Sequence, residues 1–303
     1  MRRNGMIYFL LVLMALSACG TPVQHAAATA APVSAVTAAS AETSVPTPIP
    51  TAVPTLPPTP VPTPAPSPTP EPVTVERLDA GEFDGYFDDA VFIGDSLTKA
   101  LGNYASSRRQ EEPGFLGDAR FMGVVNMNVR NASSNRAYEN GVTFRYRGKA
   151  VTIVEGIHAY GAKKAFIMLG TNDFDSHPIE NIVDYYGKLI ELLQRECPDT
   201  QIILQGILPI TQSYSKKIRV PIDAWNGIND TIGRICETYG VTFLRFGEQL
   251  MDEQGYLPLS LCSDQAYHLS REGQDIWVRA LRLYAARQMC PDADVVLIGL
   301  DPQ

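Results

Sequence analysis

The amino-acid sequence predicts a mixed α/β fold, a three-layer α/β/α sandwich in which a parallel sheet lies between two layers of helices. Short apolar runs of strand length alternate along the chain with longer segments in which apolar residues recur every three or four positions. The first pattern is typical of buried strands and the second of amphipathic helices, and their alternation favours a parallel sheet covered on both faces. Residues 74–303 carry this pattern and are numerous enough for one domain with a complete core.

Two core strands, a small hairpin and two helices are expected in the first half of this domain. The second helix is expected to end at Gly161, because glycine readily takes the left-handed conformation that closes helices. The expected order is a strand over 90–93, a short helix over 97–104, a loop over 105–118, a strand over 120–122 that ends at Gly123, a hairpin of 142–146 with 149–151, and a helix over 152–160.

Three more core strands and three helices are expected in the second half. Pro178 suits the first position of a helix, and Pro198 ends that helix. Ser270 can cap the last helix, because its hydroxyl can accept a hydrogen bond from an amide of the first turn. The expected order is a strand over 165–169, a helix over 178–195, a strand over 201–205, a loop over 209–221, a helix over 223–239, a strand over 241–244 and a final helix from Ser270 to about 288.

The tetrapeptide Gly94-Asp95-Ser96-Leu97 follows the first expected strand directly and is the most informative motif of the chain. A buried strand that ends in a glycine-containing turn presents the serine hydroxyl at the carboxyl edge of the sheet, where open α/β proteins bind their ligands. Gly170-Thr171-Asn172-Asp173 follows another expected strand, and His268 lies shortly before the last helix. These three sites are therefore expected to converge at one edge of the sheet.

Together the three blocks resemble the SGNH/GDSL hydrolases, a family of serine esterases and acylhydrolases, over roughly residues 89–288. The resemblance implies the architecture that the pattern predicts, with a flavodoxin-like parallel sheet. It also implies a serine ester hydrolase that works through an acyl-enzyme.

Ser96 is the candidate nucleophile and His268 the candidate base. A serine hydroxyl becomes an effective nucleophile when a base removes its proton, and the ordinary pKa of histidine suits that role. The alternative role for Ser96 is to cap the helix that follows it. Of the other histidines, His25 lies in a segment without a core, His158 lies inside an expected helix, and His177 lies just beyond the second block. The family supplies its base from the turn before the last helix, which favours His268 and leaves His177 as a candidate substrate contact.

Asp264 is the candidate third member of a catalytic triad. The family's usual pattern places an aspartate three residues before the histidine, where this chain has Gln265, and Asp264 stands four residues before it. A bulge that absorbs this offset would let Asp264 bind the imidazole and fix its tautomer. Otherwise a serine–histidine dyad does the work and Asp264 is an ordinary turn residue.

Three donors are expected to form the oxyanion hole: the backbone N–H groups of Ser96 and Gly123 and the side-chain amide of Asn172. The resemblance assigns Asn172, through the family's Gly-x-Asn-Asp block, and Gly123, through its block-two glycine. Gly123 lacks the usual asparagine-plus-glycine spacing, so nearby asparagines could share or take its role: Asn126, Asn128 and Asn131. Asn126 is also a candidate substrate contact.

Asp95 and Asp173 are expected to accept backbone N–H bonds that hold Ser96 and Asn172 in position, not to act as an acid–base pair. A metal site would need His, Asp and Glu side chains that converge at ligand spacing, and we expect neither a metal ion nor a cofactor. Four cysteines follow Cys19, and none has metal-ligand spacing. Free thiols are expected, although export would permit the disulfides Cys197–Cys236 or Cys262–Cys290.

Residues 1–18 are typical of a bacterial lipoprotein signal peptide. Arg2 and Arg3 give a positive start, and residues 6–16 form an apolar stretch too short to span a bilayer as a mature helix. Leu16-Ser17-Ala18-Cys19 resembles a lipobox, which implies cleavage before Cys19 and acylation of its sulfur; an ordinary signal peptide is the alternative. Because a diacylglyceryl group carries the two chains that stable anchoring needs, we expect a lipid-anchored protein on the extracytoplasmic face of the cell membrane.

Residues 19–73 are expected to form a disordered stalk, rich first in Ala and Thr and then in Pro. From Val45 to Pro72, thirteen of twenty-eight residues are Pro, a composition that favours a stiff polyproline II spacer. A proline-rich docking motif is the alternative interpretation. The net charge of −8, without a cluster of Lys or Arg, argues against nucleic acid as a partner and against electrostatic adhesion to membranes.

The sequence therefore indicates an extracytoplasmic serine esterase. The resemblance and the expected extracytoplasmic location favour O-acetylated or other short-acyl carbohydrate esters of the cell envelope as substrates. Short lipid esters are a further option. Two other functions stay open. One is transfer of the acyl group to a sugar hydroxyl, and the other is carbohydrate binding by a lipoprotein that keeps the fold without turnover.

Overall fold

The computed structural model describes residues 70–137, 141–173 and 179–296. The predicted signal peptide and the predicted stalk up to residue 69, which begins with the expected acylation site Cys19, lie outside the described residues, as does His177. Val73, the last residue of the predicted stalk, is buried and pairs with Val295 in a two-stranded sheet of β1 (Val73–Thr74) and β9 (Val295–Val296). No helix in the described ranges is both long and apolar enough to cross a membrane.

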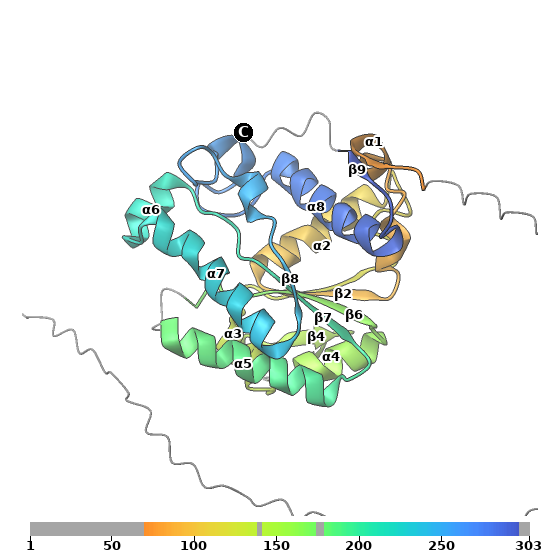
Figure 1. The fold of residues 1–303 in the computed structure, drawn as a ribbon. Helices are drawn as coiled ribbons and strands as arrows, with labels where there is room; N and C mark the ends of the chain where they lie inside the picture. The colour runs from red at the N-terminus through yellow and green to blue at the C-terminus, as the bar shows by residue number, and fades with distance from the viewer. Residues whose placement is uncertain (1–69, 138–140, 174–178, 297–303) are drawn as a thin grey trace, which may run out of the picture. The chain divides into compact units, whose positions relative to one another are not determined.

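A five-stranded parallel sheet forms the centre of the domain (Figure 1). Its strands are β2 (Ala90–Gly94), β3 (Arg120–Gly123), β6 (Lys164–Met168), β7 (Gln201–Gln205) and β8 (Thr242–Leu244). Their order across the sheet is β3-β2-β6-β7-β8, and all neighbours are parallel. This is the flavodoxin-like order of doubly wound proteins, in which the second strand of the chain lies outside the first. The predicted fold class is confirmed.

Helices cover both faces of this sheet (Figure 1). One face carries α1 (Val75–Asp79), α2 (Ser96–Arg108) and α8 (Arg271–Met289), and the other carries α3 (Val129–Ser133), α4 (Ile153–Tyr160), α5 (Ile179–Glu196) and α7 (Ile222–Tyr239). Successive residues of β2 alternate between the two cores: Val91 and Ile93 pack with the second group of helices and Phe92 with the first. The predicted site lies at the carboxyl ends of β2 and β6, where Ser96 and Asn172 follow the strands.

Several predicted local signals are confirmed. Gly161 ends α4 at a φ of 63°, as expected, and a capping box of Thr152 and Glu155, which was not predicted, begins that helix. Ser270 caps α8 through a bond from the N–H of Gly273 at 3.3 Å. The hairpin is formed by β4 (Phe144–Tyr146) and β5 (Lys149–Val151).

Two predicted loops contain helical structure, and the prediction was wrong there. The helix that begins at Ser96 continues through the predicted loop as far as Arg108, with Ala105 buried in the core. The predicted loop 209–221 contains α6 (Gln212–Ile218), which Thr211 caps by accepting the N–H of Tyr214. Three 3₁₀ helices, η1 (Asp84–Phe87), η2 (Gly247–Leu250) and η3 (Leu259–Leu261), were also not predicted.

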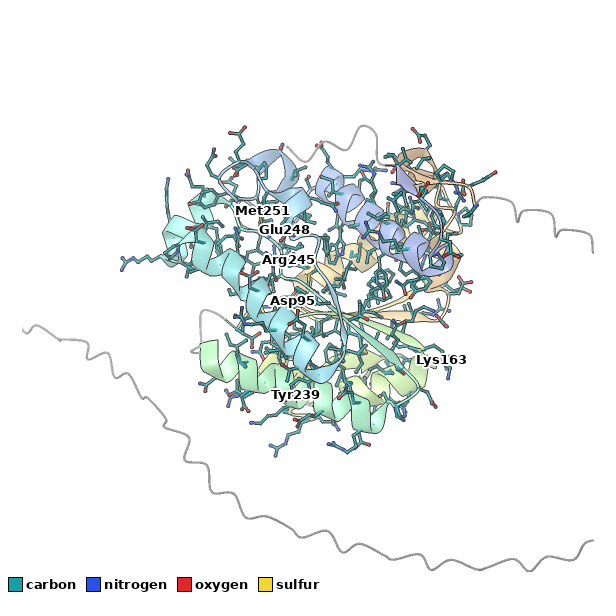
Figure 2. All side chains as sticks on the ribbon, in the orientation of Figure 1. Asp95, Lys163, Tyr239, Arg245, Glu248 and Met251 are labelled. Atoms are coloured by element: carbon teal, nitrogen blue, oxygen red, sulfur yellow. The ribbon has the colours of Figure 1, made fainter. Side chains whose placement is uncertain are left out.

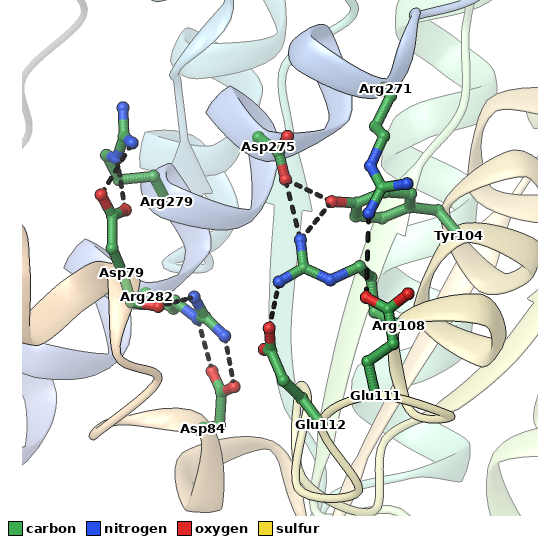
Figure 3. A network of polar contacts seen from close by, with 10 residues as sticks. All are labelled: Asp79, Asp84, Tyr104, Arg108, Glu111, Glu112, Arg271, Asp275, Arg279 and Arg282. Atoms are coloured by element: carbon green, nitrogen blue, oxygen red, sulfur yellow. Dashed lines mark hydrogen bonds and ion pairs between the residues drawn. The ribbon is translucent and has the colours of Figure 1, made fainter.

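A network of ion pairs ties α8 to α2 and to the segment that precedes β2 (Figure 3). Arg282 of α8 meets both carboxylate oxygens of Asp84, at 2.8 and 2.7 Å, and both side chains are buried. Arg108 of α2 lies 3.2 Å from Asp275 of α8. The network therefore fixes α8, whose first turn follows the segment that carries His268.

Replacing Asp84 with alanine is expected to lower the free energy of unfolding by about 3–5 kcal/mol, because the charge of Arg282 is then buried without a counter-ion. The matched control is Asp79→Ala. Asp79 makes the same two-bonded contact with Arg279, at 2.8 and 3.0 Å, but in a solvent-exposed position. That change is expected to lower the free energy by less than about 1 kcal/mol. Urea denaturation measures both, and equal losses would contradict this account of the buried pair.

Candidate active site

Ser96 is the first residue of α2 and lies directly beyond the carboxyl end of β2. Asp95, not Ser96, caps the helix, because its Oδ1 accepts the N–H of Leu97 at 2.9 Å. The interpretation of Ser96 as a helix cap is therefore wrong, and its hydroxyl is available for another contact. The free N–H groups and the positive dipole end of a helix also favour negative charge at this position.

The structure brings Ser96, His268 and Asp264 together in one chain of contacts. The hydroxyl of Ser96 lies 2.8 Å from Nε2 of His268, although the two residues are 172 positions apart. Nδ1 of the same imidazole lies 2.5 Å from Oδ2 of Asp264. Because a carboxylate only accepts, Nδ1 carries a proton and Nε2 can accept the proton of the serine. This is the geometry of a triad, not of a dyad.

Gln265 absorbs the one-residue offset between Asp264 and the family's usual spacing. Its backbone takes the left-handed conformation, with φ at 63°. Its carbonyl accepts hydrogen bonds from the hydroxyls of Thr211, at 2.6 Å, and Ser213, at 3.0 Å. Residues at the start of α6 thus hold the bulge that lets the carboxylate reach the imidazole.

The second oxygen of Asp264 organises the turn that leads to the histidine. Oδ1 accepts three backbone N–H bonds at 2.9–3.1 Å, from Ala266, Tyr267 and His268. Burial opposes ionisation of Asp264, but the hydrogen bonds from the imidazole and from these amides outweigh it and lower the pKa to about 2. The carboxylate therefore stays charged at neutral pH and can stabilise an imidazolium.

Asn172 lies at the same edge and contacts the turn before Ser96. Its Nδ2 donates to Oδ2 of Asp95 at 3.2 Å and to the carbonyl of Met127 at 3.0 Å. Both amide hydrogens therefore have acceptors in this structure. To donate to an oxyanion, Asn172 must share or give up one of these two hydrogen bonds. The bond to Asp95 is the longer and therefore the weaker of the two.

Gly123 ends β3 opposite Gly94 of β2, next to the first turn of α2. A Cβ on Gly123 would lie 2.2 Å from the backbone nitrogen of Lys99, so only glycine allows this close approach. The main chain at Gly123 is thus held beside the helix turn that begins with Ser96, where the resemblance places an oxyanion donor.

The other polar candidates lie outside the triad. Asn126 is exposed in the turn after β3, with φ at 62°. Asn128 uses its side-chain oxygen to cap α3, by accepting the N–H of Asn131 at 2.8 Å. His158 lies on α4, with Nε2 2.9 Å from the carbonyl of Glu196.

Asp95 and Asp173 both accept backbone N–H bonds, but only Asp95 does so in the predicted place, next to Ser96; the bond to Asp173 comes from α3. Both side chains are completely buried, and Asp173 receives the N–H of Val129 at 3.2 and 3.0 Å on its two oxygens. Asp95 lies between the two helix layers (Figure 2). Burial raises its pKa to about 7, although the N–H of Leu97 and the neighbouring His268 act in the opposite direction.

The buried carboxyl of Asp95 gives stability a specific pH dependence. In the unfolded chain this carboxyl ionises near its ordinary pKa of 3.8, and in the folded protein near 7. Between these values the native state keeps a proton that the unfolded state has lost, so the free energy of unfolding falls by about 4 kcal/mol as pH rises through this window. Urea denaturation at several pH values is expected to show this slope in the wild type and to lose it in Asp95→Asn. The exposed Asp199→Asn is the control, and an unchanged slope in Asp95→Asn would refute the assignment.

Several contacts at the site had no signal in the sequence. The thiol of Cys262 lies 3.4 Å from Oδ1 of Asp264, and the ring of Tyr267 packs on the imidazole of His268 with centroids 4.7 Å apart. All four cysteines in the described ranges are free thiols, so the structure forms neither of the possible disulfides. Within the same ranges, no three His, Cys, Asp or Glu side chains come close enough to hold a metal ion.

Comparisons with known proteins identify the family and the fold of the chain. A model of the GDSL-like lipase/acylhydrolase family matches residues 92–276. No curated protein matches the sequence. Two solved structures share the fold. One is of a protein suggested to be a platelet activating factor from Streptococcus pneumonia; it is 20% identical, the match covers 69% of this chain and 92% of that chain, and the TM-score is 0.50. The other is of a protein suggested to be an acylhydrolase from Bacteroides fragilis; it is 14% identical, the match covers 73% of this chain and 92% of that chain, and the TM-score is 0.52.

Proposed function

The chain belongs to the GDSL-like lipase/acylhydrolase family, and on that premise we propose an extracytoplasmic serine esterase that removes short acyl groups from carbohydrates of the cell envelope. One observation carries the proposal: an unbroken chain of hydrogen bonds runs from Ser96 through His268 to Asp264. A protein that only binds carbohydrate has no need of this chain, which therefore supports turnover.

The proposed reaction has two halves. Ser96 Oγ attacks the ester carbonyl while Nε2 of His268 takes its proton, and the imidazolium then gives that proton to the departing alcohol. Water attacks the acyl-enzyme by the same route, which releases the acid and restores the serine. Asp264 keeps Nδ1 protonated and stabilises the positive imidazole in both halves.

Negative charge that develops on the carbonyl oxygen needs fixed donors. The N–H of Ser96 at the start of α2, the N–H of Gly123 and the amide of Asn172 are assigned to this role. Asn172 would then turn one hydrogen from Asp95 towards the oxyanion, an exchange that a buried and easily protonated Asp95 permits.

The substrate class is inferred from the openness of the site and from the predicted export. The side chain of His268 is 29% exposed, and Ser96 is partly exposed. An ester on a bulky polymer can approach such an edge, so O-acetyl groups on envelope polysaccharide suit it. A lipid anchor at Cys19 would keep the enzyme at the membrane, and the proline-rich stalk would let it reach outward.

Acetate release from envelope polysaccharide tests the proposal. Wild-type protein is expected to release acetate from O-acetylated wall polysaccharide, and also 4-nitrophenol from 4-nitrophenyl acetate. Polysaccharide that has been deacetylated by mild base is the blank. A folded protein that hydrolyses neither ester would refute the esterase, and acetate transfer to an added sugar in place of release would favour the acyltransferase.

A further inference from the structure

Two adjoining hollows lie along β3, the edge strand next to the one that leads to Ser96. Their volumes are about 360 and 310 Å³, and they share Lys99, Phe121 and Gly123 in their linings. The first hollow runs from α2 towards Arg145 on β4, and the second runs along α2 towards Arg109. Because they meet at shared residues, we treat them as one channel and call it the cationic groove.

Every charged residue that lines the cationic groove is positive. Four cations contribute, and neither lining includes an acidic residue: Lys99, Arg109, Arg120 and Arg145. This contrasts with the chain as a whole, whose net charge is −8. A concentration of one sign in a hollow of an oppositely charged protein focuses the electrostatic potential there and favours an anionic ligand.

The four cations differ in how they are held. The guanidinium of Arg109 donates to four backbone carbonyls at 2.9–3.4 Å, so it is a fixed charge at the wall. Arg145 also has a structural contact, with the carbonyl of Gly148 at 3.0 Å. Lys99 and Arg120 are exposed, and neither forms an ion pair with another residue in the described ranges. These two side chains are the ones that can close on a ligand.

The groove reaches the first turns of α2, the helix that begins with the proposed nucleophile. Lys99 lies three residues after Ser96 on α2, and residues at this spacing are neighbours on a helix surface. Gly123, which the groove and the proposed oxyanion hole share, packs against the backbone of Lys99. An anionic group bound at the Lys99 and Gly123 end of the groove would therefore lie near the ester that Ser96 attacks, and Arg120, the first residue of β3, would attract the next acidic group along the polymer.

We propose that the cationic groove binds an acidic group of the substrate, so that the preferred substrate is an acyl ester on a negatively charged polysaccharide, with carboxylate or phosphate groups near the ester. This inference rests on the proposed function and specifies its substrate. It gives the groove a role that hydrolysis of a neutral acetate does not require.

Three acetylated sugars that share one ring scaffold test this inference: O-acetyl derivatives of glucose, glucuronate and glucose 6-phosphate, acetylated to the same degree. Acetate release is expected to give a kcat/KM about tenfold higher for an acidic ester than for the neutral one at low salt, and the difference should shrink in 0.5 M NaCl because ions screen exposed charges. Comparison of kcat/KM between the glucuronate ester and the glucose 6-phosphate ester shows whether the groove prefers a carboxylate or a phosphate.

The double variant Lys99→Gln/Arg120→Gln is expected to bring the ratio of acidic to neutral kcat/KM to within about twofold of one. The control is Lys163→Gln, which removes an exposed cation that lines neither hollow and lies far from Asp95 in Figure 2. Its ratio should equal that of the wild type. A wild-type ratio near one, or a high ratio that survives in the double variant, would overturn the inference and leave the esterase intact.

Binding provides a readout that does not depend on turnover. Calorimetry with the Ser96→Ala variant is expected to detect oligoglucuronate binding that salt weakens, and little binding of the matching neutral oligoglucoside. Equal binding of the two would count against the groove. If the wild type hydrolyses none of the esters while Ser96→Ala still binds the acidic oligosaccharide selectively, the proposed esterase activity is refuted and the proposed anion binding is not.

Discussion

Replacing Ser96 with alanine is expected to lower kcat/KM for 4-nitrophenyl acetate by about 10⁴- to 10⁶-fold. Without Oγ no acyl-enzyme forms, and the imidazole of His268 loses the group it activates. The fold should survive, because Asp95 and not Ser96 caps α2. Ester hydrolysis and urea denaturation, measured on the same preparation, separate the loss of chemistry from a loss of structure.

Ser107→Ala is the matched control for this experiment. Ser107 is an exposed residue of the same helix, about three turns from the site, and its loss should leave hydrolysis unchanged. If Ser96→Ala retains more than about a hundredth of wild-type kcat/KM while folding normally, the nucleophile is not Ser96, since triad serines contribute far more than this.

Asp264→Asn is expected to lower kcat by about 10⁴-fold, because an amide in this place cannot keep Nδ1 of the imidazole protonated while Nε2 accepts. The substitution is chosen because its Oδ1 can still accept the three backbone N–H bonds that hold the turn before His268. The turn should therefore persist while the negative charge is lost.

Asp252→Asn is the control for the role of Asp264. Asp252 also accepts backbone N–H bonds in a turn, from Gln254 and Tyr256 at 3.0 and 2.9 Å, but no histidine contacts it in the described ranges. Measurements of ester hydrolysis should give the wild-type kcat for this variant. A loss of less than tenfold in Asp264→Asn would indicate a serine–histidine dyad.

The sheet and its longer helices could be predicted because their signals are local. Continuous apolar runs such as residues 90–93 and 165–169 have the length of buried strands, and the apolar residues of α7 recur at helical spacing over eighteen residues. α6 and α3 were missed because helices of seven and five residues are too short for such a pattern. A 3₁₀ helix such as η1, with four residues, gives an even weaker periodic signal.

The residues of the site also separate into those with a local signal in the sequence and those without one. Ser96 and Asn172 stand in contiguous motifs, and His268 could be selected from only four histidines. The bulge at Gln265 could be named as a requirement, but its support from α6 could not, because Thr211 is 54 positions away. The same applies to the buried Asp84–Arg282 pair, whose partners are 198 positions apart, and to the cationic groove, whose charges come from separate elements.

Labelling with a fluorophosphonate probe tests the convergence of Ser96 and His268 most directly, because only a serine activated by a neighbouring base reacts readily with it. Intact-mass and peptide analysis of the wild type is expected to show one phosphonyl adduct, on Ser96, with no adduct in Ser96→Ala and strongly slowed labelling in His268→Ala. A wild type that hydrolyses esters yet carries the adduct on another residue, or labels at the same rate without His268, would contradict the account.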